Sequence, residues 1–176
     1  MDRVKTLVLA ALLSGLAGLS HAQSPLFEPI YDVLTHPRCM NCHTVTDFPR
    51  QGDERRRHDQ LVVRGEDNHG APTLQCSACH QDHNVADDNV PGAPHWGLAP
   101  LSMGWEGLNE VELCEALKDL SKNGNRTLQD LLDHMTHDAL VLWGWSPGKH
   151  RTTPPLDHPE FVQALAQWVN AGGPCL

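Results

Sequence analysis

The sequence is poor in aromatic residues and lacks a strand-like pattern. Only 5% of its 176 residues are aromatic, with three Phe and one Tyr beside five Trp. Gly and Pro number 14 and 13, and they recur so often that long regular elements are limited. No stretch alternates apolar and polar residues in the way that predicts a half-buried strand. We therefore expect a mainly α, loop-rich fold with little or no β structure.

An excess of positive charge is also missing. The chain has 13 Lys and Arg against 22 Asp and Glu, for a net charge of −9. The basic surface that binds nucleic acid is therefore absent, and we expect no nucleic-acid partner. An acidic surface favours encounter with a basic partner protein, although many soluble exported proteins are acidic for solubility alone.

Long apolar runs are absent after residue 22. A positively charged start precedes an apolar run over residues 6–19, and Ser20-His21-Ala22 has the small-x-small form of a cleavage site. The run is shorter than the roughly 20 residues that a membrane span needs. We predict a signal peptide over 1–22, one domain over 23–176 and no membrane span. The destination is an oxidising compartment, most simply a bacterial periplasm.

Two short stretches of the chain have the same pattern, Cys39-Met40-Asn41-Cys42-His43 and Cys76-Ser77-Ala78-Cys79-His80. Cys-x-x-Cys-His is the attachment signature of a c-type haem. The two thiols add across the vinyl groups of one porphyrin, and the adjacent imidazole ligates the iron from the proximal side. The sequence thus predicts two covalent haem c groups. Cys39, Cys42, Cys76 and Cys79 would attach them, with His43 and His80 as proximal ligands.

Other uses of these four cysteines fit less well. A structural zinc is one alternative, but the pairs start 37 residues apart and zinc gives no reason for a His after each pair. A thioredoxin-like redox pair requires a βαβ pattern, which the sequence lacks. A disulfide within either pair would close a strained ring.

Two cysteines lie outside the motifs, Cys114 and Cys175. In an oxidising compartment they most simply form a disulfide, which would tie the C-terminus to a helix over residues 110–121. Two free buried thiols are the alternative.

Capping signatures predict the helices of the second half of the chain. Asn109, Thr127 and Asp157 are each followed three residues later by Glu or Asp. They predict helices over 110–121 and 127–139, and a third from Asp157 to the glycines at 172 and 173. Helical spacing of apolar residues predicts one more short helix, over 26–36, which leads into the first motif.

The middle of the chain is expected to be irregular. Residues 44–70 are polar and suggest a wrapping loop, with the charge run over 53–59 as a solvated surface. The segment over 91–100 contains three Pro, which excludes a helix or a central strand. We expect a haem face to hold this segment in place.

The second axial ligand of each iron decides the chemistry. With His or Met there, the iron only passes electrons, whereas an open position can bind peroxide, oxygen or nitric oxide. Nine histidines remain after the motifs and the signal peptide are set aside. Sequence position orders the candidates as His58, His95, His134, His36 and Met103. On the helix over 127–139, His137 should face water and Met135 should lie in the core. We predict that both irons are six-coordinate and that at least one has two His ligands.

The double motif resembles the small dihaem c-type cytochromes. More narrowly, three segments resemble exported bacterial proteins described as isoquinoline 1-oxidoreductase subunits: residues 36–43, 91–96 (Pro-Gly-Ala-Pro-His-Trp) and 143–148 (Trp-Gly-Trp-Ser-Pro-Gly). The chain has no molybdopterin-sized domain and no iron–sulfur cysteine set. The resemblance therefore implies an electron-accepting companion of a molybdenum hydroxylase.

Taken together, these features predict an exported electron-transfer protein with two covalent haems and a redox partner protein. The alternative is a small haem enzyme, such as a peroxidase or reductase, or a gas sensor with one open iron.

Overall fold

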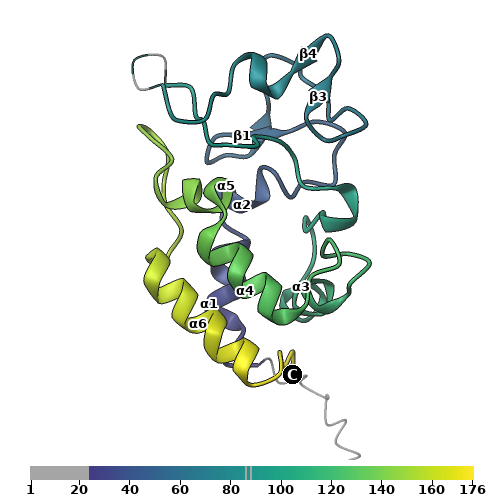
Figure 1. Ribbon diagram of the computed structural model, residues 1–176, viewed down its shortest axis with the longest axis vertical. Helices are drawn as coiled ribbons and strands as arrows, with labels where there is room; N and C mark the ends of the chain where they lie inside the picture. Colours follow the sequence, from purple (N-terminus) through teal and green to yellow (C-terminus); the bar gives the residue numbers. More distant parts are fainter. Residues whose placement is uncertain (1–23, 86, 88) are drawn as a thin grey trace, which may run out of the picture.

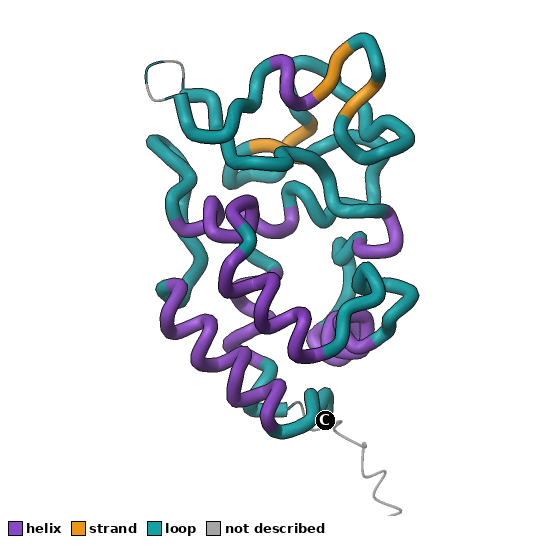
Figure 2. Tube along the Cα trace, in the orientation of Figure 1, coloured by secondary structure: helices purple, strands orange, loops and turns teal. Residues whose placement is uncertain are grey.

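The computed structural model describes residues 24–85, 87 and 89–176. The predicted signal peptide and its cleavage point lie outside the described residues. The chain is mainly helical, as the sequence predicts, and its longer helices occupy one half of the molecule (Figure 1). The other half consists of loops and two small hairpins, and Figure 2 shows how much of it is irregular.

The elements are short. The α-helices are α1 (Glu28–Leu34), α2 (Pro37–Met40), α3 (Glu110–Lys118), α4 (Leu128–His137), α5 (Ala139–Leu142) and α6 (His158–Asn170). Three 3₁₀ turns are η1 (Cys76–Ala78), η2 (Leu101–Met103) and η3 (Trp143–Trp145). The strands are β1 (Arg50–Gln51), β2 (Arg56–Arg57), β3 (Gly70–Ala71) and β4 (Leu74–Gln75). The antiparallel pairs β1–β2 and β3–β4 are the only sheets among the described residues.

The three predicted helix starts are confirmed. Asn109, Thr127 and Asp157 each cap their helix with a complete capping box. The end of α6 at Asn170, just before the predicted glycines, also agrees, whereas α3 and α4 end earlier than predicted. α3 ends at Lys118. α4 ends at His137, because Asp138 leaves the helix and caps α5. A cap side chain is therefore a sharper signal than the end of an apolar stripe.

One apolar core lies in the helical half. It joins buried residues of α1, α3, α4 and α6, among them Ile30, Leu113, Leu131 and Leu165. The Cys114–Cys175 disulfide expected from the sequence is present, with both cysteines buried in this core, and it ties the C-terminus to α3. This half is therefore held by packing, three capped helices and a covalent bond.

The loop half has almost no apolar core of its own. Between residues 44 and 104, the buried hydrophobic residues in the described part of the chain are Val62, Ala93 and Leu98. Buried polar contacts take over instead, above all the guanidinium of Arg64. It donates to the carbonyls of Thr44, Thr46 and Ala99 and so joins three loop segments.

The charge run over 53–59 is only partly a solvated surface, so that prediction was incomplete. Arg56, Arg57 and Asp59 are exposed. However, Asp53 pairs with the buried Arg38, and Arg55 pairs with Glu106. Sequence alone could not separate these residues, because their partners lie far away in the chain.

None of the helices in the described part of the chain has the length and apolar character needed to cross a membrane.

Candidate functional site

Two pockets contain the two motifs, one in each. The inner pocket, about 330 Å³, is bordered by Cys39, Cys42 and His43 together with residues of α4 and the Trp143–Trp145 turn. The outer pocket, about 400 Å³, is bordered by Cys76, Cys79 and His80 together with β1, β4 and the Pro-rich segment. Both volumes lie within the roughly 300–1,000 Å³ typical of cofactor sites.

The two motifs have the same backbone geometry. In the first, the N–H groups of Cys42 and His43 donate to the carbonyl of Cys39 at 3.2 and 3.0 Å. In the second, the N–H groups of Cys79 and His80 donate to the carbonyl of Cys76 at 3.2 and 2.9 Å. One tight turn therefore sets the spacing between the two thiols and the imidazole at each site.

The His43 ring is fixed by two contacts. Its Nδ1–H donates to the carbonyl of Met103 at 2.8 Å, and Trp105 stacks on its face with ring centroids 3.4 Å apart. Burial lowers the pKa of His43 to about 4, against the opposing effect of the Met103 carbonyl. The ring is therefore neutral at physiological pH, with its proton on Nδ1 and the Nε2 lone pair available to a metal.

The His80 ring repeats this arrangement. Its Nδ1–H donates to the carbonyl of Pro91 at 2.7 Å, and Trp96 stacks on it at 4.6 Å with an interplanar angle of 13°. Burial again lowers the pKa. These Trp and carbonyl partners were not predicted. The acceptor lies two residues before the Trp at one site and five before it at the other, so no common spacing marked them.

None of the four motif cysteines forms a disulfide, whereas Cys114 and Cys175 are paired with each other. Burial raises the pKa of the Cys39 thiol to about 12 and that of Cys42 to about 11. Cys79, by contrast, is exposed. The first motif is therefore half-buried to buried along its length, whereas the second is the more exposed of the two.

His58 lies opposite His80 in the outer pocket. The two ring centroids are 6.0 Å apart and the ring planes are inclined at 77°. Two imidazoles that bind one metal from opposite sides, with bonds of about 2 Å, have centroids roughly 6 Å apart. Among the residues that the structure describes, one hydrogen bond reaches the His58 ring, a long one of 3.4 Å from Gln60 N–H. This spacing fits one iron between His58 and His80.

In the inner pocket, the candidates for the second iron ligand are less clearly arranged than His58 and His80 are in the outer pocket. His134 of α4 borders it, is half-buried and lies 3.5 Å from a carboxylate oxygen of Asp138. Burial lowers the pKa of His134, which favours the neutral ligand form. His95 also borders this pocket but is exposed, as is His69, which the sequence did not single out. His134 is therefore the best-placed candidate here.

The remaining candidates are engaged elsewhere. His36 caps α2 by accepting from Arg38 N–H, its Nε2 meets the Thr152 hydroxyl at 3.2 Å, and it borders neither pocket. Met103 borders the inner pocket, but on the side where its carbonyl holds His43. Met135 is buried in the core and His137 is exposed, both as predicted from the helix.

The charges of the pocket walls suit an anionic cofactor. The outer pocket is bordered by Arg38, Arg50 and Arg151, and no Asp or Glu among the described residues borders it. The inner pocket has Arg38, Lys122 and Arg126 with Asp138 as its one carboxylate. Such a bias in a chain with a net charge of −9 matches the propionate groups of a haem. The Nε atom of Arg38 is buried and has no hydrogen-bond partner.

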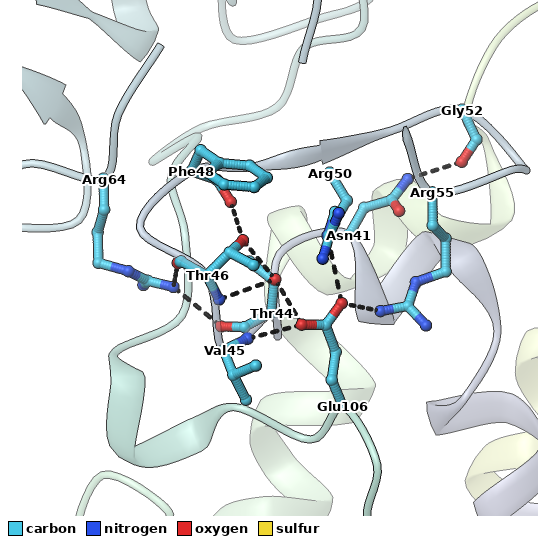
Figure 3. A network of polar contacts seen from close by, with 10 residues as sticks. All are labelled: Asn41, Thr44, Val45, Thr46, Phe48, Arg50, Gly52, Arg55, Arg64 and Glu106. Atoms are coloured by element: carbon cyan, nitrogen blue, oxygen red, sulfur yellow. Dashed lines mark hydrogen bonds and ion pairs between the residues drawn. The ribbon is translucent and has the colours of Figure 1, made fainter. Parts of the chain in front are cut away.

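A polar network fastens the first motif to the segment that carries Trp105 (Figure 3). Glu106 accepts hydrogen bonds from the Thr44 hydroxyl at 2.8 Å and from Val45 N–H at 3.0 Å. The same carboxylate pairs with Arg50 and Arg55. Because Thr44 follows His43 and Glu106 follows Trp105, the network holds the stacked pair in place.

In the described part of the chain, no three side chains of His, Cys, Asp and Glu gather to form a metal site. A haem iron needs no such group, since the porphyrin supplies its equatorial ligands. Comparisons with protein-family models, curated proteins and solved structures give no match for this chain.

Proposed function

We propose that this protein is an exported electron carrier with two covalent c-type haems, one in each pocket. The observation that carries the proposal is the repeated site: a Cys-x-x-Cys-His turn in a pocket wall, with the histidine held through Nδ1 by a backbone carbonyl and stacked on a Trp. Bound haem would supply one-electron chemistry at each site.

His58 and His134 are the distal ligands in this proposal. His58 lies beside His80, and His134 borders the same pocket as His43, so two histidines would be available to hold each iron. Two imidazoles leave a lower reduction potential than an imidazole with a Met, because Met ligation raises it. A carrier of this kind suits electrons from a low-potential donor.

The proposed partner is a redox protein with a basic surface, in keeping with the charge of −9. Electrons would enter or leave at the outer site, because Cys79 is the one exposed cysteine of the two motifs. A molybdenum hydroxylase is the partner that the sequence resemblance suggests. Location in the periplasm follows from the signal peptide expected over residues 1–22.

Intact mass and spectra of the purified protein test the proposal. The mass should equal the chain from residue 23 plus two haems, and both irons should be low-spin. A mass without haem, or with zinc, would refute it. Rapid binding of carbon monoxide by the parent protein would favour the enzyme or gas-sensor alternative.

Single substitutions then test the ligands. His58→Ala should make only the outer haem high-spin and open to carbon monoxide, and His134→Ala only the inner one. His137→Ala is the matched control, because His137 lies on the same helix as His134 but is exposed and bonded to Asp133. Unchanged spectra in both ligand variants would return the choice to His95, His69 and Met103.

A further inference from the structure

The inner and outer pockets share a wall. The residues that border both are Arg38, Cys42, Gly97, Leu98 and Trp143. Arg38 is the one charged residue among them, and its side chain is 1% exposed. A full positive charge therefore lies between the two sites, in a position that water scarcely reaches.

The counter-charge of Arg38 lies on one side only. Its NH2 group pairs with Asp53, whose side chain is 31% exposed and which borders neither pocket. Asp53 also accepts a hydrogen bond from the N–H of Thr152 at 3.2 Å, and this bond helps to hold the carboxylate outside both pockets. Arg38 Nε is buried and has no hydrogen-bond partner among the described residues, and the ring of Trp143, which borders both pockets, lies 5.9 Å from the guanidinium carbon.

We propose that Arg38 is a shared electrostatic determinant of both sites, and that Asp53 sets how strongly its charge acts on each. This inference rests on the proposed function, since it requires a haem in each pocket. In this role Arg38 acts on the two sites through its charge and is a ligand of neither iron.

The physical reason is the sign of the charge that changes. Reduction lowers the charge of an iron site by one, so a nearby cation favours the reduced state and raises the reduction potential. The effect is larger in a buried wall than at a surface, because the surrounding dielectric screens it less. Since Arg38 borders both pockets, its removal should lower both potentials together.

The other charged residues of the walls each serve one pocket. Arg50 and Arg151 border only the outer pocket, whereas Lys122, Arg126 and Asp138 border only the inner one. This division supplies matched controls for Arg38. A change at Arg151 should act on the outer haem alone, and a change at Arg126 on the inner haem alone.

The experiment is a redox titration of the full dihaem protein, followed by absorption spectroscopy. Arg38→Gln should lower both potentials, each by roughly a tenfold change in the ferrous-to-ferric ratio, or about 59 mV. Arg38→Lys keeps the charge and should restore most of the loss. Arg151→Gln and Arg126→Gln should each lower one potential only.

Asp53→Asn gives the test with opposite sign. It leaves Arg38 unbalanced, so both potentials should rise. Because Asp53 is partly exposed, this variant also decides the matter if Arg38→Gln does not fold. A shift in one potential only, or in neither, would overturn the inference.

The parent protein separates this inference from the proposed function. Without two haems in the parent, the proposed function itself fails. With two haems present and only single-site shifts from Arg38 and Asp53, the carrier proposal stands and the shared role of Arg38 is lost.

Discussion

Each motif histidine is held by one carbonyl and one indole ring, and the two contacts do different work. The carbonyl fixes which nitrogen carries the proton, while the stacked Trp limits rotation of the ring. Neither contact is made by a residue next to the motif in sequence. The five letters of Cys-x-x-Cys-His thus specify the chemistry, and distant residues specify its geometry.

The stacked Trp residues offer a test at this scale. Trp105→Leu removes the flat surface that faces His43, so the inner haem should gain a high-spin component, whereas Trp105→Phe should keep the parent state. Trp96→Leu should act in the same way on the outer haem only. Electron paramagnetic resonance of the oxidised protein measures both. An unchanged inner signal in Trp105→Leu would contradict this role.

Glu106 makes the network of Figure 3 sensitive to acid. Burial alone would raise the pKa of Glu106, but hydrogen bonds from Val45 and Thr44 and the charges of Arg50 and Arg55 outweigh it, so the pKa is lowered from 4.5. A lowered pKa in the folded state means that the stabilisation is complete above about pH 4.5 and is lost as the pH falls further.

Glu106→Gln should therefore lower the free energy of unfolding at pH 7 by about 1–3 kcal/mol, the usual effect of leaving buried partners unsatisfied. The difference between variant and parent should shrink below pH 4.5. Urea unfolding at pH 7, 5 and 3.5 measures it. A difference that stays constant over this range would show that the Glu106 charge is not involved.

At the scale of elements, the capped helix starts could be predicted, and so could the end of α6 before its glycines, but the ends of α3 and α4 could not. A start is marked by a local pair such as Asn109 and Glu112, which bond to each other. The end of α4 depends on Asp138, whose carboxylate caps the next helix. Asp138 could either continue α4 or cap α5, and the apolar pattern of α4 does not reveal which of the two occurs. The short hairpins β1–β2 and β3–β4 were missed because two-residue strands have no periodicity to detect.

The disulfide gives a prediction for α3 and the C-terminus. Cys114 and Cys175 are 61 residues apart, and the chain-entropy model assigns about 4 kcal/mol to a loop of that length. Cys114→Ala with Cys175→Ala should lower the free energy of unfolding by roughly that amount, with both haem spectra unchanged. Urea unfolding of the variant and of the parent protein measures this loss of unfolding free energy. A loss that also alters the inner haem would mean that α3 holds the pocket more directly.

At the scale of the whole molecule, the two halves are stabilised in different ways. The helical half has the apolar core, whereas the loop half has three buried hydrophobic residues in its described part. We therefore expect the outer haem to act as the missing core of the loop half. The mainly α fold could be predicted from the sequence, and so could the disulfide between Cys114 and Cys175. The shared wall could not, because Arg38, Leu98 and Trp143 meet only through the tertiary fold.

Removal of the outer haem tests this division. Cys76→Ser with Cys79→Ser should leave the helical half protected in hydrogen exchange, while amides between residues 49 and 99 exchange faster. Cys39→Ser with Cys42→Ser is the matched variant, which removes the inner haem. In this variant the amides of α4 and α2 should exchange faster as well. Uniform loss of protection in the first variant would mean that the two halves fold as one unit.

The inner pocket draws its wall from residues as far apart as Val33 and Phe161. If the chain is exported from its N-terminus, as proposed, the first motif arrives long before α4 and α6, so at that moment the pocket does not exist. The attachment signature is confined to the five residues of the motif. The proposed carrier would therefore mature in a fixed order in time: the thioether bonds would form on an open chain, and the late helices would then close over a group that is already fixed in place.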